Sequence, residues 1–426
     1  MLAATYARPG LVCADHLIDV PLDHADPAGH TIELFARVVN APGRERDDRP
    51  TLLYLQGGPG GKADRPTAGN VWLDRALQEF QVVLMDQRGT GRSSPATRQT
   101  LAGMSPAEQA DHLSHFRADS IVADAELLRA ELLGDRPWSV LGQSFGGFCA
   151  VTYLSRAPAG LREVLIAGGL PGLGVDADAV YRAAYPRVRA KNRMYFARYP
   201  GDRDVLARVF AHVRDHDVRM PTGERLTPQR LQTVGIQLGS GTNLDSLHYL
   251  LEEALVAGPA GPTLSDTFLR GVDAIVSLAE HPLFAVLHEP IYGYAGATRW
   301  AAHRVREEFG EFDPAAPLPL LTGEMIYPWM FDEDPALVDL REVAHRLAAK
   351  DDWPALYDLP QLQRNTVPVA AAVYHDDMYV DREHSLETAS AVHGVRTWVT
   401  NEHEHDGLRA SGNVIDRLLG MVRGRC

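Results

Sequence analysis

Cysteine is scarce in this sequence, which has three among its 426 residues: Cys13, Cys149 and Cys426. They are odd in number and lie far apart, so they form neither the framework of a small disulfide-stabilised domain nor a C-x-x-C zinc motif. Structural disulfides are in any case rare in the reducing cytoplasm. We therefore expect three reduced thiols in a cytoplasmic protein.

Positive charge is also in short supply, and long apolar runs are missing. Forty-two Lys and Arg against 56 Asp and Glu give a formal net charge of −14 at pH 7. So acidic a chain repels nucleic-acid phosphates and anionic lipids, which argues against both as partners. No apolar stretch approaches the roughly 20 residues that cross a bilayer. Residues 1–20 lack the basic start and the apolar run of a secretory signal.

Short β-rich runs alternate with helical stretches in the first 170 residues. Strands are predicted at 31–39, 50–55, 80–85, 138–141 and 162–167, and helices at 119–133 and 148–156. Regular alternation of this kind is typical of an α/β protein with a mostly parallel sheet.

Helical patterns dominate the middle of the chain, from about residue 176 to 362. Strand character returns at 367–374 and 397–400, and a helix follows over 408–422. The simplest interpretation is an α/β core interrupted by a helical cap. We expect the first part of the core at 1–170, the cap insertion at 171–365 and the C-terminal part of the core at 366–426.

The strongest chemical signal is Gly142-Gln143-Ser144-Phe145-Gly146-Gly147, which lies between a predicted strand and a predicted helix. This is a G-x-S-x-G motif in the context where a sharp strand-to-helix turn presents the serine Oγ. The N-terminus of the helix adds backbone donors for a developing oxyanion. Ser144 is therefore the candidate nucleophile.

A serine nucleophile needs a base and a carboxylate that orients the base, and in hydrolases of this kind both follow the serine along the chain. The run at 367–374 leads into Asp376 and Asp377, and the run at 397–400 leads into His403 and His405. From position alone, either aspartate suits the acid role and either histidine the base role. The same residues together with His375 are also possible metal ligands, but a metal site leaves the serine turn unexplained.

A second glycine cluster, Gln56-Gly57-Gly58-Pro59-Gly60-Gly61, follows the run at 50–55. Serine hydrolases take one oxyanion N–H from the residue after the nucleophile, here Phe145, and another from an earlier loop, for which Gly57 is the candidate. The loop Asp86–Ser93 lacks both the dinucleotide fingerprint and the P-loop pattern. We interpret it as a structural loop beside the active site, with Asp86 and Arg88 paired internally.

These motifs make the chain resemble the prolyl aminopeptidase (proline iminopeptidase) family of α/β-hydrolase serine peptidases. The resemblance is carried by Gly57–Gly60, the Asp86–Ser93 loop, Gly142–Gly147, Asp377-Met378 and His405. It implies an α/β-hydrolase core with a mostly parallel sheet and an inserted helical cap. The family's acid precedes a methionine, and its acid-to-histidine interval is close to the 28 residues between Asp377 and His405. Both points favour Asp377 and His405, and the one departure is Gln56 in place of the family's histidine.

Members of this family bind the free amine of the substrate with carboxylates from the cap. The resemblance therefore draws attention to Glu289 and Glu324, which lie among aromatic and apolar residues. Such carboxylates reject blocked N-termini, because a neutral amide would leave them uncompensated. The plainer alternative is that they form internal salt bridges with Arg299 or Arg304. The residues expected to line a small apolar pocket for a proline ring are Tyr292, Tyr327, Trp329 and Phe145.

The sequence thus predicts a serine aminopeptidase that releases N-terminal proline from peptides with a free N-terminus, through an acyl-enzyme. It requires no metal or organic cofactor. The alternative is an esterase or amidase acting on small acyl substrates with the same triad, for which the cap carboxylates would matter little. A non-catalytic binding protein of the same fold would not need the complete set of serine, acid, histidine and oxyanion glycines.

Overall fold

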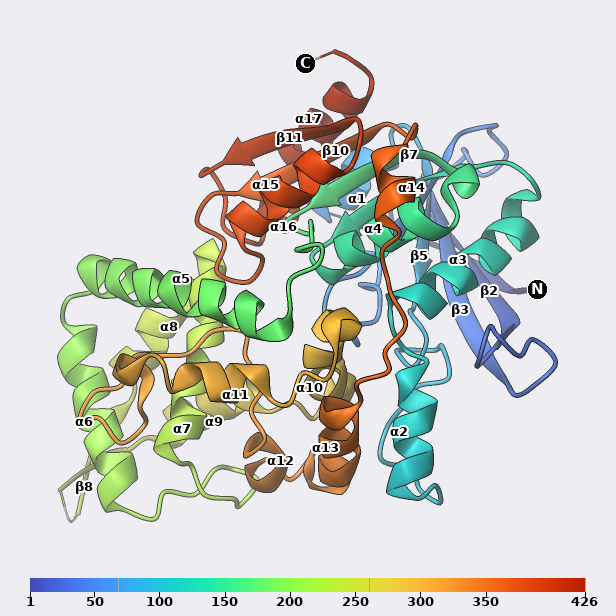
Figure 1. Ribbon diagram of the computed structural model, residues 1–426. Helices are drawn as coiled ribbons and strands as arrows, with labels where there is room; N and C mark the ends of the chain where they lie inside the picture. Colours follow the sequence, from blue (N-terminus) through green and yellow to red (C-terminus); the bar gives the residue numbers. More distant parts are fainter. Residues whose placement is uncertain (68, 260, 426) are drawn as a thin grey trace.

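The computed structural model describes residues 1–67, 69–259 and 261–425, so Cys426 lies outside the described residues. Its core is a nine-stranded sheet in the order β1-β2-β3-β5-β4-β6-β7-β10-β11 (Figure 1). The strands are β1 Leu2–Arg8, β2 Leu11–Pro21, β3 Thr31–Asn40, β4 Thr51–Leu55, β5 Gln81–Met85, β6 Trp138–Gln143, β7 Leu161–Ala167, β10 Val369–Tyr374 and β11 Val395–Thr400. β1, β2, β3 and β5 pair antiparallel in turn, and all pairs from β5 to β11 are parallel. The predicted mostly parallel sheet is confirmed.

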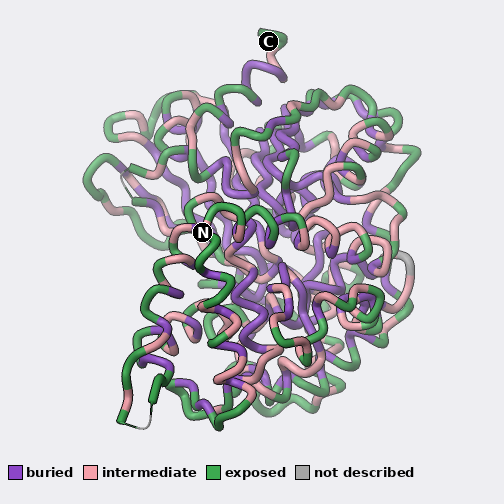
Figure 2. Tube along the Cα trace, turned by 90° about the vertical axis from the view of Figure 1, so that its left-hand side faces the viewer, coloured by how far each residue is buried: buried purple, intermediate pink, exposed green. Residues whose placement is uncertain are grey.

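Helices cover both faces of this sheet. The helices of the core are α1 Val71–Ala76, α2 Pro106–Ser114, α3 Ala118–Leu133, α4 Phe145–Arg156, α15 Arg382–Ala391, α16 Gly407–Ala410 and α17 Asn413–Val422. α1 and α17 bury their apolar sides on one face, and α3 and α4 on the other. β4, β6 and β10 are consequently buried along their whole length, as central parallel strands are. Figure 2 shows the buried residues concentrated in the interior and the exposed ones along the outside of the trace.

A long, mainly helical segment separates β7 from β10, and we call it the cap segment. Its helices are α5 Ala177–Arg198, α6 Asp202–Asp215, α7 Pro228–Gln232, η2 Thr233–Gly239, α8 Gly241–Glu252, α9 Asp266–Val276, α10 Pro282–Leu287, η3 Glu289–Ala295, α11 Ala301–Arg306, η4 Gly310–Phe312, α12 Met330–Glu333, η5 Val338–Leu340, α13 Arg341–Ala349 and α14 Leu359–Gln363, and it contains the hairpin of β8 Leu255–Gly258 with β9 Gly261–Leu264. The cap segment lies below the sheet in Figure 1. Its division from the core at residues 171 and 365 stays a prediction.

Two observations bear on the expected reduced thiols and on the expected lack of a membrane-spanning segment. Cys13 and Cys149 are buried free thiols. Throughout the described ranges, no helix combines the length and the apolar character that crossing a membrane requires.

Asp86 and Arg88 are both paired internally, each with a residue outside their own loop. Asp86 forms two hydrogen bonds of 2.7 Å with the guanidinium of Arg65, and Arg88 Nε lies 2.8 Å from the carboxylate of Asp124 in α3. The two side chains leave the loop in different directions, one towards the segment after β4 and the other towards α3. The loop therefore connects three parts of the core, which agrees with its predicted structural role.

Candidate active site

Ser144 stands at the turn between β6 and α4. Its backbone has φ 55° and ψ −126°, a conformation that is unfavourable for a non-glycine residue unless the surroundings fix it. A Cβ at Gly146 would lie 1.9 Å from the carbonyl oxygen of Leu55, and one at Gly142 would lie 2.3 Å from that of Gly146. Because glycines permit these close approaches, the turn presents Ser144 at the carboxyl end of the sheet with the N-terminus of α4 behind it.

His405 and Asp377 lie in contact beside this turn. His405 Nδ1 is 2.7 Å from Asp377 Oδ2, and both side chains are buried. The other carboxylate oxygen accepts backbone hydrogen bonds from Tyr379 (2.8 Å) and Val380 (3.1 Å), so the acid is fixed in orientation. With Nδ1 directed at Asp377, Nε2 of His405 is left for a reacting group.

The alternative acid and base lie elsewhere. Asp376 forms an exposed pair with Nδ1 of His375 at 2.9 Å. His403 packs edge-on against Tyr374 and Trp398, with ring centroids 6.3 and 6.4 Å away. Within the described part of the chain, no group of three or more His, Cys, Asp or Glu residues is arranged to hold a metal ion.

The charges around His405 favour its protonated form. Burial by itself would lower the pKa of His405, but the carboxylate of Asp377 raises it above its ordinary value, with help from Glu324 and a smaller opposing effect of Arg409. A raised pKa makes the imidazole a stronger proton acceptor, while the protonated form that it becomes is stabilised by Asp377. This arrangement suits a group that accepts a proton and then returns it.

Ser144 and His405 line one cavity of about 370 Å³ between the core and the cap segment. The core supplies the loop after β4, the serine turn and α16, and the cap segment supplies η2, α9, α10 and Glu324. The lining residues are Gln56, Gly57, Gly58, Pro59, Gly61, Gln143, Ser144, Ile236, Ala274, Ile275, Ser277, Leu278, His281, Phe284, Glu324, Tyr379, His405 and Arg409. The volume lies within the range of small-molecule sites and suits a short peptide segment.

Gly57 lies against the serine. A Cβ at this position would be 2.9 Å from Ser144 Cβ and 2.8 Å from Gln143 Oε1, so a larger residue would displace the turn. The side-chain amide of Gln87 holds this loop, because it donates a hydrogen bond of 2.9 Å to the carbonyl oxygen of Gln56. Phe145 begins α4 directly after Ser144, and its N–H therefore belongs to the helix N-terminus. The two predicted oxyanion donors thus both lie next to Ser144: Phe145 follows it in the chain, and Gly57 is close to it in space.

The two cap glutamates have different surroundings. Glu289 is buried, and its oxygens accept hydrogen bonds from Ala301 (3.1 Å) and Ala302 (2.9 Å) at the start of α11. Glu324 lines the cavity of Ser144, and among the described residues its carboxylate has no hydrogen-bond partner. Burial raises the pKa of both to about 7. In the part of the chain that the structure describes, neither forms the alternative salt bridge with Arg299 or Arg304, and of the two Glu324 lines the cavity of the reacting groups.

The aromatic residues expected around a proline ring do not border this cavity. Tyr327 is fully buried and stacks on Trp329, with ring centroids 5.4 Å apart. Trp329 and Tyr292 each line a separate, smaller cavity, and the ring of Phe145 is buried behind the serine turn. These four residues thus belong to the packing that surrounds the site.

The apolar wall comes instead from residues that sequence reasoning missed. Ile236, Ile275 and Phe284 face the cavity from the cap segment, and Tyr379 faces it from the loop after Asp377. The Tyr379 ring meets that of His405 edge-on, with centroids 4.9 Å apart. Tyr379 could have been found in the sequence from its position two residues after Asp377. Ile236, Ile275 and Phe284 occur in ordinary helical patterns, which give no such signal.

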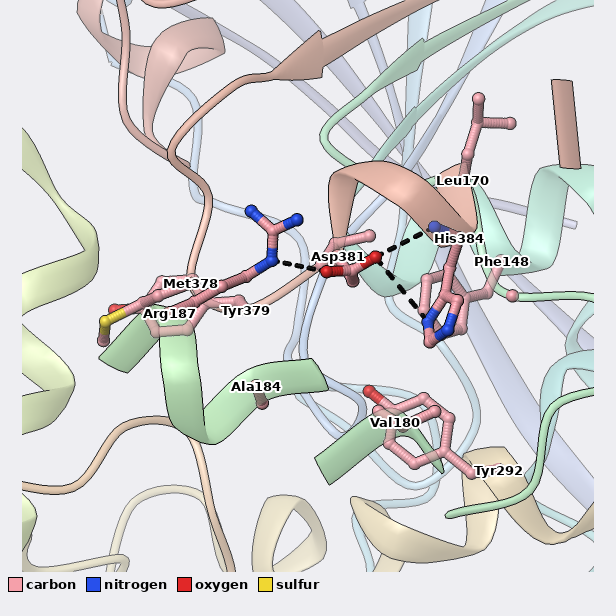
Figure 3. Close-up of a pocket in the computed structure, with 12 residues that line it drawn as sticks. Phe148, Leu170, Val180, Ala184, Arg187, Tyr292, Met378, Tyr379, Asp381 and His384 are labelled. Atoms are coloured by element: carbon pink, nitrogen blue, oxygen red, sulfur yellow. Dashed lines mark hydrogen bonds and ion pairs between the residues drawn. The ribbon is translucent and has the colours of Figure 1, made fainter. Parts of the chain in front are cut away.

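A cap-to-core ion pair supports the loop that carries the acid. Arg187 of α5 pairs with Asp381, which also accepts the backbone N–H of His384 at 2.9 Å at the start of α15 (Figure 3). These residues line a small cavity of about 20 Å³ that shares Tyr379 with the larger one. Since Asp381 lies four residues after Asp377, the pair connects the cap segment to the acid loop.

Comparisons with known proteins show the family of this chain. A family model described as the alpha/beta hydrolase fold matches residues 50–287. A proline iminopeptidase of Aeromonas sobria is 50% identical over 421 residues and covers 98% of each chain, and one of Aspergillus aculeatus is 35% identical over 427 residues, or 96% of this chain and 93% of the relative. The crystal structure of a Mycobacterium smegmatis proline iminopeptidase aligns over 96% of this chain and 100% of its own, at 15% identity and a TM-score of 0.43. The two sequence relatives span the core and the cap segment alike, and this chain belongs to the proline iminopeptidase family of α/β hydrolases.

Proposed function

We propose that the chain is a serine aminopeptidase that releases N-terminal proline from peptides. The observation that carries the proposal is the cavity shared by Ser144, His405 and Glu324. His405 contacts Asp377 at 2.7 Å, and the carboxylate of Glu324 has no hydrogen-bond partner among the described residues. The family relatives named proline iminopeptidase support the choice of proline. A cytoplasmic location stays a prediction.

The reaction follows from the positions of these groups. Ser144 Oγ attacks the carbonyl carbon of the first residue while His405 Nε2 takes the hydroxyl proton. Gly57 and Phe145 donate backbone N–H groups to the oxyanion. The C–N bond then breaks, His405 gives its proton to the leaving amine, and the acyl group remains on Ser144. Water attacks the ester with His405 as base, which frees proline and restores Ser144.

We assign recognition of the substrate amine to Glu324. A protonated secondary amine bound there would compensate a carboxylate that has no partner of its own, whereas an N-acylated substrate would leave it uncompensated. Glu289 is the matched contrast, because its two oxygens already accept hydrogen bonds from the start of α11. Its part is to position that helix in the wall behind the site.

The test is hydrolysis of proline 4-nitroanilide, its N-acetyl form and 4-nitrophenyl acetate by the wild type and by Ser144→Ala, Glu324→Gln and Glu289→Gln. We expect proline 4-nitroanilide to react and its N-acetyl form not to react. Ser144→Ala should abolish turnover of both the ester and the anilide. Glu324→Gln should lower kcat/KM for proline 4-nitroanilide by about tenfold to a hundredfold and leave the ester rate within about twofold. Glu289→Gln should change both rates alike.

Equal turnover of blocked and free anilides would replace the aminopeptidase by an esterase or amidase. Loss of both activities in Glu324→Gln, in a variant that folds, would remove the amine-binding role from this residue. Full activity of Ser144→Ala would refute the nucleophile.

A further inference from the structure

One acidic and one basic side chain, Glu324 and Arg409, line the cavity that contains Ser144. Among its lining residues Glu324 is the one carboxylic acid and Arg409 the one arginine; the other titratable groups are His281, His405 and Tyr379. Charged groups in an otherwise neutral site are strong determinants of which ligand charges are accepted. Two opposite charges on the walls of one small cavity match a ligand that carries both.

Arg409 is an exposed residue of α16, four residues after His405, and it lines the cavity. In the described residues its guanidinium enters no ion pair, in contrast to the paired arginines Arg65, Arg88, Arg187 and Arg304. Arg409 lines the same cavity as His405 and lies near enough for its positive charge to oppose the rise in the pKa of His405. A planar guanidinium of this kind offers paired N–H donors that fit a carboxylate.

The place of Arg409 in the chain suggests which end of the substrate it meets. Glu324 comes from the cap segment and is the proposed partner of the substrate's amine, one residue before the scissile bond. Arg409 comes from the core on the segment that carries His405, the group that protonates the leaving amine. In a dipeptide or tripeptide the C-terminal carboxylate follows the leaving nitrogen by one or two residues, each about 3.5 Å long when extended.

We propose that Arg409 binds the C-terminal carboxylate of short peptides and so makes the enzyme prefer dipeptides and tripeptides. The inference rests on the proposed aminopeptidase function. It adds a second recognition point on the leaving-group side, opposite the amine site. Because the contact is made equally in the ground state and the transition state, it should lower KM and leave kcat nearly unchanged.

The experiment compares Pro-Gly with prolyl-glycinamide, and Pro-Gly-Gly with its amide, in the wild type, Arg409→Gln and Arg409→Lys. Arg417→Gln is the matched control, since Arg417 is an exposed arginine of α17 that does not line the cavity. The wild type and the control should favour the free carboxylate by about threefold to tenfold in kcat/KM, through KM. Arg409→Gln should remove the preference, Arg409→Lys should retain part of it, and 0.5 M salt should weaken it.

Proline 4-nitroanilide, which has no carboxylate, separates this inference from the proposed function. If Arg409→Gln still hydrolyses the anilide, and its ratio of kcat/KM for the free acid to that for the amide falls to about one, both stand. If the anilide reacts but wild type and Arg409→Gln show the same ratio of acid to amide, the role of Arg409 is refuted while the aminopeptidase remains. Failure of the wild type on every proline substrate refutes the function itself.

A carboxylate on a side chain of the second residue has the same chemistry. Prolyl-glutamate amide against prolyl-glutamine amide tests this source. A preference that depends on Arg409 in this pair, without one between Pro-Gly and its amide, would overturn the assignment to the C-terminus.

Discussion

Replacing Glu324 by glutamine should stabilise the folded chain at pH 8 while it weakens binding of the substrate amine. The pKa of Glu324 is raised by burial from 4.5 to about 7. The folded state therefore keeps the proton up to about pH 7, whereas the unfolded chain releases it near pH 4.5. The stability associated with this group is complete below pH 4.5 and is lost as the pH rises through 7. Glutamine does not titrate, so the variant avoids that loss.

The size of the effect follows from the same pKa. A rise from 4.5 to about 7 corresponds to at most about 3 kcal/mol at pH 8. The carboxylate of Glu324 borders an open cavity and is half-buried, so water reduces the value, and we expect about 1 to 2 kcal/mol. For a chain of this length, that change moves the melting temperature by about 1 to 3 °C.

Thermal unfolding of wild type and Glu324→Gln at pH 5 and pH 8 measures this difference. The variant should melt close to the wild type at pH 5 and above it at pH 8. Glu253→Gln, which replaces an exposed glutamate of the cap segment, should melt with the wild type at both values. If Glu324→Gln melts below the wild type at pH 8, the carboxylate has a stabilising partner in the free enzyme, and the reasoning from an uncompensated charge is refuted.

The remaining predictions concern the reacting groups. With proline 4-nitroanilide, log(kcat/KM) should fall on the acid side with a slope approaching two, because both His405, whose pKa is raised, and Glu324, whose pKa is about 7, must lose a proton. With 4-nitrophenyl acetate the slope should be one, and equal slopes for the two substrates would exclude Glu324 from amine binding. Asp377→Asn should lower kcat by about 10³- to 10⁴-fold for both substrates with little change in KM, since His405 would lose its fixed tautomer; a loss below tenfold would contradict this. Gly57→Ala places a Cβ 2.9 Å from Ser144 Cβ, so steady-state kinetics should show that kcat falls about 10- to 1000-fold. A kcat equal to that of the wild type would show that the loop moves to accept the added methyl group without cost.

Local sequence predicted those parts of the site that one stretch of chain determines. The turn at Ser144 follows from a buried strand, three glycines and a helix, and the structure has β6 and α4 there. The parallel strands before Asp377 and His405 were likewise visible as short apolar runs. β1 was missed because it is an exposed edge strand without regular alternation. The final helix was predicted as one, but it is interrupted at residues 411 and 412 between α16 and α17.

Contacts between distant segments were beyond the reach of sequence patterns. Glu289 and Glu324 have similar neighbours in sequence, yet α11 folds back onto the first and leaves the second facing the cavity. Asp86 and Arg88 stand two residues apart, but their partners Arg65 and Asp124 come from different elements. Each outcome depends on how helices of the cap and core pack, which a local pattern does not encode.

The close packing of glycines around Ser144 limits where mutations can change the substrate specificity of this enzyme. At Gly57, Gly146 and Gly147, an added methyl group would meet backbone or the serine itself at 1.9 to 2.9 Å, so nearly every mutation on that side damages catalysis before it alters selectivity. Ile236 and Ile275 on the opposite wall border open space and can be exchanged for larger or smaller side chains. Changes of substrate specificity, in nature or in the laboratory, are thereby confined to the side of the cavity that the cap segment forms. A mutant library that varies Ile236 and Ile275 should therefore yield new specificities.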